Sequence, residues 1–205
     1  ASTPRSITAA LTEVHDMERI IEKAQALLAS KGSAVIALEG RAAAGKTTLA
    51  AALAERLNAE VIHMDDFFLP PELRTAERLS QPGGNVHYER FAAEVADGIL
   101  SGKPFEYSVF DCSIMGISGK KRVTPGGVAI VEGAYALHPQ IPDIYDIKVF
   151  VTAPLETRLE RILRRNGSEK LEAFRRKWIP LEEAYFSAFD IEDKCDIVIE
   201  QLRGL

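Results

Sequence analysis

The chain has 205 residues, of which 46% are hydrophobic and 27% charged, and this composition excludes intrinsic disorder, collagen-like repeats and a coiled coil as its main organisation. One domain of this length buries enough surface to fold without a disulfide or a metal staple. The 25 basic and 30 acidic residues give a net charge of −5, which argues against general nucleic-acid binding because such binding needs cations that neutralise phosphates.

The two cysteines, Cys112 and Cys195, form neither a CxxC pair nor a disulfide framework, and this usage predicts a reducing compartment. No apolar run reaches the length of a membrane span, and no signal-peptide core follows the N-terminus. We therefore expect a soluble, cytoplasmic protein whose partners include neither nucleic acid nor a membrane.

Residues 7–30 predict an amphipathic helix that precedes the rest of the domain and ends at Gly32. We expect this helix to pack on the domain that follows, with a homo-oligomer contact as the alternative. Its apolar residues recur every three or four positions and are Leu11, Val14, Met17, Ile21, Ala24 and Leu28.

From Ser33 onward, short apolar runs alternate with helical patterns, which predicts one three-layer α/β domain over residues 1–205. Prolines and glycines in 69–90 indicate a long loop. The runs lack polar alternation, as parallel strands buried on both faces do, and they span 34–38, 61–64, 128–131, 147–151 and 196–199. Helices are expected at 46–57, 91–100, 155–165 and 169–189, the last interrupted near Pro180.

Residues 40–47 match the phosphate-loop pattern G-x-x-x-x-G-K-[ST] at each fixed position. A buried strand feeds this loop and a helix starts at Lys46, so free backbone N–H groups and the helix dipole converge on a phosphate. Lys46 would reach the β- and γ-phosphates, and the Thr47 hydroxyl would ligate Mg²⁺. The expected contacts to ATP come from Gly40, Arg41, Ala42, Ala43, Ala44, Gly45, Lys46, Thr47 and Thr48.

Three classes of protein use such a loop. A GTPase switch needs an N/T-K-x-D segment, and the sequence has none. A mechanical or assembly ATPase usually has a strand that ends in Asp, often followed by Glu, and a residue supplied by a neighbour. A small-molecule kinase needs a carboxylate near the acceptor hydroxyl and a basic lid over the phosphates.

Two predicted strands end in carboxylates, one at Asp65 and Asp66 and the other at Glu132. The carboxyl ends of parallel strands face the ligand crevice, so one carboxylate can accept the hydroxyl proton while the other holds Mg²⁺. Alternation along the strand predicts Asp65 on the same face as His63, with Asp66 opposite. A helix-capping role for either aspartate is the alternative. We expect His63 to be a strand residue rather than a ligand.

Residues 158–177 carry eight basic and three acidic side chains, a local balance of 8 − 3 = +5. Arg158, Arg161 and Arg165 share one helix face, and Gly167 supplies a hinge-like break. Because guanidinium groups can spread the charge of a transferring phosphoryl group, this segment predicts a lid; a solvated face is the alternative. An apolar face of the same helix comprises Leu155, Leu159, Ile162 and Leu163.

Five segments occur in a characteristic order. They are 40–47, Asp-Asp-Phe-Phe at 65–68, Phe-Asp at 110–111, Val-Glu-Gly at 131–133 and Thr-Arg-Leu-Glu-Arg at 157–161. In this order they resemble the uridine kinase, phosphoribulokinase and pantothenate kinase family of P-loop kinases, and most closely the uridine kinase-like proteins. The resemblance runs from about Ser33 to Ile199 and implies a five-stranded parallel sheet with helices on both faces and a mobile helical lid.

The resemblance also implies a role for each matching residue. Asp65 would be the catalytic base and Lys46 the phosphate clamp. Thr47 and Glu132 would hold Mg²⁺. The lid residues at the phosphates would be Arg161 and Arg165.

The acceptor segment departs from the family pattern. Uridine kinases carry an Asn-Phe-Asp-His-Pro-type stretch whose Asp holds the ribose, whereas residues 84–91 here read Gly-Asn-Val-His-Tyr-Glu-Arg-Phe. Phe110 replaces a Tyr that helps to hold the nucleobase. The candidate acceptor contacts are therefore Asp65, His87, Tyr88, Arg90, Phe110 and Asp111.

The sequence thus predicts an ATP- and Mg²⁺-dependent kinase that phosphorylates a hydroxyl of a small metabolite. A uridine or cytidine hydroxyl is the leading acceptor, and pantothenate, a sugar phosphate or glycerate are alternatives. The competing class is a P-loop ATPase, or a protein that binds ATP as a regulatory or assembly ligand.

Overall fold

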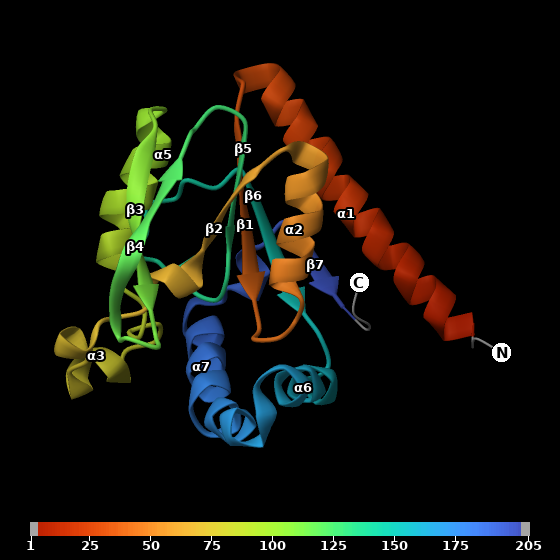
Figure 1. Cartoon of the computed structure of the whole chain (residues 1–205). Coiled ribbons are helices and arrows are strands. Elements are labelled where there is room, and N and C mark those ends of the chain that lie inside the picture. The colour runs from red at the N-terminus through yellow and green to blue at the C-terminus, as the bar shows by residue number, and fades with distance from the viewer. Residues whose placement is uncertain (1–3, 202–205) are drawn as a thin grey trace.

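The computed structural model describes the backbone of residues 4–201 and the side chains of residues 15–201. Its centre is a parallel five-stranded sheet in the order β2-β5-β1-β6-β7 (Figure 1). The strands are β1 (Ala34–Gly40), β2 (Glu60–His63), β5 (Val128–Glu132), β6 (Ile147–Thr152) and β7 (Ile197–Glu200). All five predicted strands and the predicted three-layer α/β fold are confirmed.

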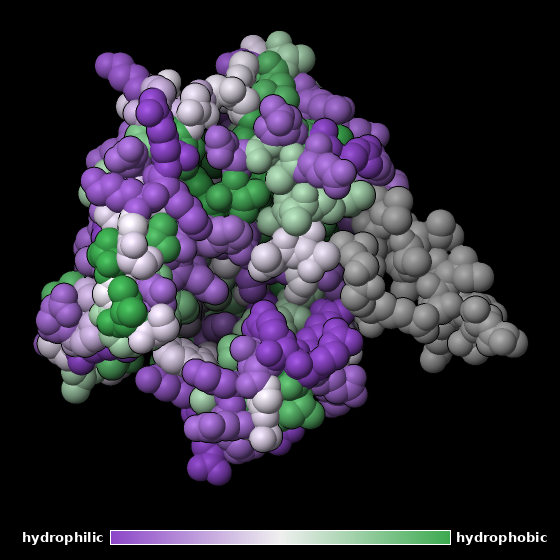
Figure 2. All heavy atoms as spheres, in the orientation of Figure 1, coloured by the Kyte–Doolittle hydropathy of each residue, from purple (hydrophilic) through white to green (hydrophobic). Residues whose placement is uncertain are grey.

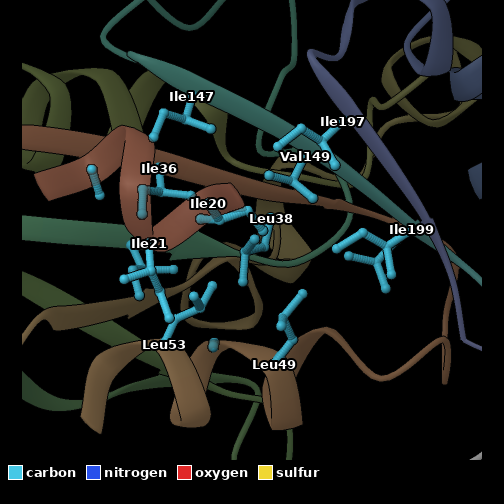
Figure 3. Packing of buried hydrophobic residues seen from close by; sticks show 14 of the residues in the cluster. Ile20, Ile21, Ile36, Leu38, Leu49, Leu53, Ile147, Val149, Ile197 and Ile199 are labelled. Carbon is cyan, nitrogen blue, oxygen red and sulfur yellow. The ribbon is translucent and has the colours of Figure 1, made fainter. Parts of the chain in front are cut away.

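Helices cover both faces of the sheet and form two apolar cores. On one face, α1 (Pro4–Lys31) packs on β1, β6 and β7, and α2 (Lys46–Leu57) packs on β1, β2 and β5. Figure 3 shows Ile20, Ile21, Leu49 and Leu53 pointing at the strand residues. The predicted N-terminal helix therefore packs on the domain as expected. Its Leu11 and Val14 side chains lie outside the described residues.

The segment after β2 is more helical than its prolines and glycines predict. It contains the 3₁₀ turns η1 (Met64–Phe67) and η2 (Pro71–Leu73) and the short helix α3 (Ala76–Ser80). A longer helix then starts at Tyr88 instead of Phe91 and comprises α4 (Tyr88–Phe91), the π-turn η3 (Ala92–Ala96) and α5 (Asp97–Ser101). This helix packs on the second face of the sheet, where Phe67, Phe91 and Phe150 belong to the second core.

An antiparallel hairpin of β3 (Phe105–Asp111) and β4 (Gly116–Val123) adjoins η1 and η3 and was not predicted from the sequence. Its strands lack the apolar runs of the central sheet because β4 is mostly exposed and carries two glycines and three basic residues. The hairpin extends the second core away from the sheet with the buried Tyr107 and Val123.

The predicted lid, residues 158–177, lies in α6 (Leu155–Ala173) and the π-turn η4 (Phe174–Trp178). Helix α7 (Ile179–Phe189) and the 3₁₀ turn η5 (Glu192–Lys194) follow it. A kink at Gly167 confirms the predicted break, whereas Pro180 lies in the first turn of α7 and interrupts nothing. The expected apolar face of α6 is wrong in part, since Ile162 is buried but Leu155 and Leu163 are exposed. None of the described helices is long and apolar enough to cross a membrane.

Candidate phosphate-binding and acceptor site

The phosphate loop connects β1 to α2 at the carboxyl end of the sheet. Gly40, Ala43 and Gly45 have positive φ angles of 136°, 58° and 108°, which fold the loop back on itself. A side chain at Gly40 would collide with the backbone of Val151, and one at Gly45 with the Gln201 carboxamide. The two glycines are therefore required by close approach of the protein itself, and not only by approach to a phosphate.

The loop presents unpaired donors to an anion. Helix α2 begins at Lys46 after Gly45, which has no side chain to cap the first N–H groups. The buried Lys46 ammonium donates to the carbonyl oxygens of Gly40 (2.8 Å) and Arg41 (2.9 Å), which leaves its third donor free of protein partners among the described residues. The donor set fits a phosphate group.

Thr47 and Glu132 meet beside this loop. The Thr47 hydroxyl donates to Glu132 Oε1 over 3.2 Å, and β5 pairs with both β1 and β2, so Glu132 lies between the ends of those two strands. Hydroxyl and carboxylate oxygens are ligands that Mg²⁺ accepts, and Mg²⁺ usually takes few protein ligands beside water and phosphate. The described residues contain no cluster of three or more His, Cys, Asp or Glu side chains that could hold a metal. A hydroxyl and a carboxylate oxygen beside the loop fit Mg²⁺ that is held together with a nucleotide.

His63 is a strand residue, as expected, at the end of β2, and its side chain also contacts Glu132. Its Nδ1 lies 2.6 Å from Glu132 Oε1, and this hydrogen bond raises the pKa of His63 above its ordinary value. The signal in the sequence is its position two residues before Asp65, at the end of a strand that pairs with β5.

The two aspartates after β2 have different surroundings, and the predicted alternation is wrong because the strand ends at His63 and η1 follows. Asp66 is buried and accepts hydrogen bonds from the Tyr107 hydroxyl (3.1 Å) and the Lys121 ammonium (2.9 Å). Asp65 is open to solvent and has no hydrogen bond or ion pair with the described side chains. Nearby protein atoms, and then the charge of Glu132, raise the pKa of Asp65.

Most candidate acceptor contacts are engaged within the fold. Arg90 donates to the carbonyl oxygens of Ser108 and Asp66, and Tyr88 lies between the Arg78 guanidinium (4.0 Å) and the His138 ring (4.4 Å). Phe110 is buried, and Asp111 accepts from the backbone N–H and hydroxyl of Ser113. His87 is half-buried, and burial lowers its pKa.

The three lid arginines do not act alike. Arg161 donates to the loop carbonyl oxygens of Ala43 (3.0 Å) and Ala44 (3.2 Å), and its buried Nη2 has no protein partner. Arg158 is buried and donates to Ala153, whereas Arg165 is exposed and donates to Asn166. The structure therefore brings Arg161 to the phosphate loop and leaves Arg165 away from it.

Two carboxylates near the loop were missed in the sequence. Glu39 is fully buried and accepts from three backbone N–H groups, those of Gly40, Tyr135 and Leu137, and from the Tyr185 hydroxyl. Burial raises its pKa to about 7. Glu182 of α7 is also buried and accepts from the Ala42 N–H. A charged residue inside the apolar run before Gly40 was the available signal for Glu39.

The site groups lie at the carboxyl ends of neighbouring strands. The loop donors follow β1, Glu132 ends β5, and Asp65 follows β2, which pairs with β5. Figure 2 shows a hollow near the middle of the molecule, between the hairpin and α6, bordered by hydrophilic side chains. The arrangement can hold a nucleotide phosphate and orient a hydroxyl against it.

Comparison with known proteins gives a family match over most of the chain. Residues 36–178 match the family model AAA_18, described as an AAA domain. The chain is 28% identical to uridine-cytidine kinase C of Dictyostelium discoideum over 151 residues, which are 70% of the chain and 33% of that protein. The chain thus spans about a third of the length of the curated relatives it matches.

Solved structures share the fold. A protein described as a possible uridine kinase from Bacillus stearothermophilus superposes with a TM-score of 0.59 at 17% identity, over 88% of this chain and 99% of that one. D-glycerate 3-kinase from Cryptococcus neoformans gives a TM-score of 0.61 at 16% identity, over 92% and 97% of the two chains. The matches confirm the P-loop kinase fold and the resemblance that the five motifs indicate.

Proposed function

The chain belongs to the AAA_18 family of P-loop domains, and from this premise we propose that it is a kinase that transfers the γ-phosphoryl group of ATP, with Mg²⁺, to a hydroxyl of a small metabolite. The observation that carries this proposal is the free Asp65 carboxylate at the end of β2, across the sheet edge from the Thr47–Glu132 pair and the phosphate loop. A kinase needs such a carboxylate beside the acceptor hydroxyl, and Asp65 is free to take that part.

In this proposal, each group of residues has a role that follows from its position. Backbone N–H groups of the loop, Lys46 and the unpartnered Nη2 of Arg161 would hold the phosphates. The oxygens of Thr47 and Glu132 would hold Mg²⁺, which supplies charge neutralisation on the phosphates when bound.

Asp65 would orient the acceptor and receive its proton. The acceptor oxygen bonds to the γ-phosphorus, the bond from that phosphorus to the bridging oxygen of ADP breaks, and the hydroxyl proton passes to the carboxylate. The raised pKa of Asp65 suits a group that takes up a proton late in the reaction. Residues 1–205 act as one domain in this scheme, with 158–177 as the lid.

The acceptor is a small molecule, and a uridine or cytidine hydroxyl remains the first candidate because the named relatives are uridine or uridine-cytidine kinases. The acceptor segment around His87 lacks the ribose-binding Asp of that family. A glycerate kinase shares the fold, so pantothenate, a sugar phosphate and glycerate are the alternatives within the proposal.

An assay of ADP release with ATP, Mg²⁺ and a panel of acceptors tests the proposal. The panel contains uridine, cytidine, pantothenate, glycerate and several sugar phosphates, and each reaction is analysed for a phosphorylated product. We expect release that depends on one acceptor and a product in equal amount to ADP. ADP and free phosphate alone, with every acceptor, would favour the ATPase class instead.

A further inference from the structure

Two adjacent glutamates of α7 contact two adjacent residues of the phosphate loop. Glu182 accepts from the backbone N–H of Ala42 over 2.9 Å. Glu183 forms a two-pronged pair with Arg41, in which Nε lies 2.8 Å from Oε1 and Nη2 lies 3.2 Å from Oε2. Neither glutamate has a part in the proposed phosphoryl transfer, so the contacts need another explanation.

Arg41 is held at several points besides Glu183. Its Nη1 donates to the Thr152 hydroxyl (3.2 Å) and to Glu192 (3.1 Å). Its guanidinium lies 5.1 Å from the centre of the Phe150 ring and 5.6 Å from that of Phe186. These partners come from β6, α7 and η5, and together they hold the guanidinium against these three elements.

Helices α6 and α7 thereby contact four consecutive loop residues. The glutamates of α7 hold Arg41 and Ala42, and Arg161 of α6 holds the carbonyl oxygens of Ala43 and Ala44. In Figure 1, α6 and α7 lie beyond the carboxyl ends of the central strands, next to the start of α2. The shape of the loop is thus set by side chains of these two helices as well as by its own glycines.

We propose that Glu183 is a positioning residue that holds the phosphate loop in its binding conformation through Arg41. The inference rests on the proposed function only in naming a nucleotide phosphate as the group that the loop binds. A loop that is already ordered loses less conformational freedom when it binds a ligand, so the Arg41–Glu183 pair increases nucleotide affinity. Bidentate arginine–carboxylate pairs suit this role because they fix direction as well as distance.

The opposite role is a competitor. If Glu183 withheld Arg41 from the phosphates, removing its charge would free the guanidinium and tighten nucleotide binding. The contacts of Arg41 with Thr152, Glu192 and two aromatic rings argue against such release. They keep the guanidinium near β6 and η5, while loss of the two-pronged pair with α7 leaves the loop less firmly held.

The test compares Glu183→Gln with Glu18→Gln. Glu18 forms a two-pronged pair with Arg56 (2.9 and 3.3 Å) between α1 and α2, and its exposure of 40% matches the 39% of Glu183. Hydrogen exchange of peptides covering residues 40–48 is measured in the nucleotide-free protein. Binding of ATP with Mg²⁺ is measured by calorimetry, with thermal unfolding as a check of folding.

We expect Glu183→Gln to speed exchange in the loop and to weaken ATP binding about tenfold, with kcat at saturating ATP within about twofold of the parent. Glu18→Gln should leave exchange and binding unchanged. Arg41→Gln breaks the same pair from the other side and should give the same faster exchange. The double variant Arg41→Gln/Glu183→Gln should lose no more affinity than Arg41→Gln alone.

Unchanged exchange in both single variants, or tighter ATP binding by Glu183→Gln, would overturn the positioning role. Failure of the parent protein to bind ATP would instead overturn the proposed function. The exchange comparison still decides the role of Glu183 in that case, because it is made without nucleotide. If Glu183→Gln does not fold, Arg41→Gln carries the same comparison.

Discussion

The two sides of the candidate site are built in different ways. The nucleotide side comes from one continuous stretch, residues 40–48. The spacing of its glycines, lysine and threonine along the sequence already matches the phosphate-loop pattern. The acceptor side joins η1, β3 and β4 through Asp66, Tyr107 and Lys121, which are far apart in the chain. A local motif therefore contains the proposed phosphate contacts, whereas the proposed acceptor side depends on long-range packing.

Each side also contains a buried carboxylate with a different kind of partner. Glu39 lies beside the phosphate loop and accepts hydrogen bonds from four donors, with no ion pair among the described residues, and burial raises its pKa. Asp66 lies under the acceptor segment and is paired with the Lys121 ammonium. Substitutions of the two carboxylates should therefore change the stability of the protein in different ways.

The largest effect is expected on the nucleotide side. Lys46→Ala removes the ammonium that faces the phosphates and should lower kcat/KM for ATP about 10³-fold. The measurement is ADP release over a range of ATP concentrations. Lys23→Ala, an exposed lysine of α1, is the control. Near-normal turnover in Lys46→Ala would remove the phosphate loop from the mechanism.

Glu39 should make the stability of the protein depend on pH. Its pKa is about 7 in the folded protein against an ordinary value of 4.5, so the folded state binds a proton more tightly than the unfolded state. The resulting stabilisation is complete below pH 4.5 and is lost as pH rises from 4.5 to 7, by about 3 kcal/mol.

Glu39→Gln should abolish this loss. The free energy of unfolding of the variant, relative to that of the parent, should increase between pH 5 and pH 7.5 in denaturant titrations. Glu55→Gln, an exposed position of α2, is the control. A difference between Glu39→Gln and the parent that stays constant with pH would contradict the account of the buried carboxylate.

On the acceptor side, Asp66→Asn leaves the Lys121 ammonium without its anion and should lower the free energy of unfolding by about 2 kcal/mol. Asp143→Asn is a matched control. Asp143 pairs with Lys148 over 2.8 Å but is 68% exposed, against 12% for Asp66, so its loss should cost about 0.5 kcal/mol or less. Equal decreases in the free energy of unfolding of the two variants would mean that burial of Asp66 does not strengthen its ion pair with Lys121.

The same contrast explains what the sequence could predict. Five strands were recognised because parallel strands buried on both faces are continuous apolar runs, as in Ala34–Gly40. The hairpin was missed because β4 is mostly exposed and polar. The alternation argument for Asp65 failed because a 3₁₀ turn begins at Met64.

Site residues were likewise predictable where a local motif places them and not where long-range packing does. The positions of Lys46, Thr47 and Glu132 follow from the motif and the strand ends, although their roles stay predictions. The contact of Glu183 with Arg41 depends on how α7 packs against the phosphate loop, and no local sequence pattern predicts that packing. Glu182 and Glu183 follow Pro180 in an ordinary helical stretch, so the sequence around them does not predict a contact with the phosphate loop.

The most direct test of phosphoryl transfer follows the γ-phosphoryl group of labelled ATP in the parent protein and in Asp65→Asn, with Asp97→Asn of α5 as the control. The account predicts that label moves from ATP to an organic acceptor in the parent and the control. In Asp65→Asn the transfer rate should fall about 10²-fold while ATP affinity stays the same. Label that appears only as free phosphate, or equal transfer by Asp65→Asn, would contradict it.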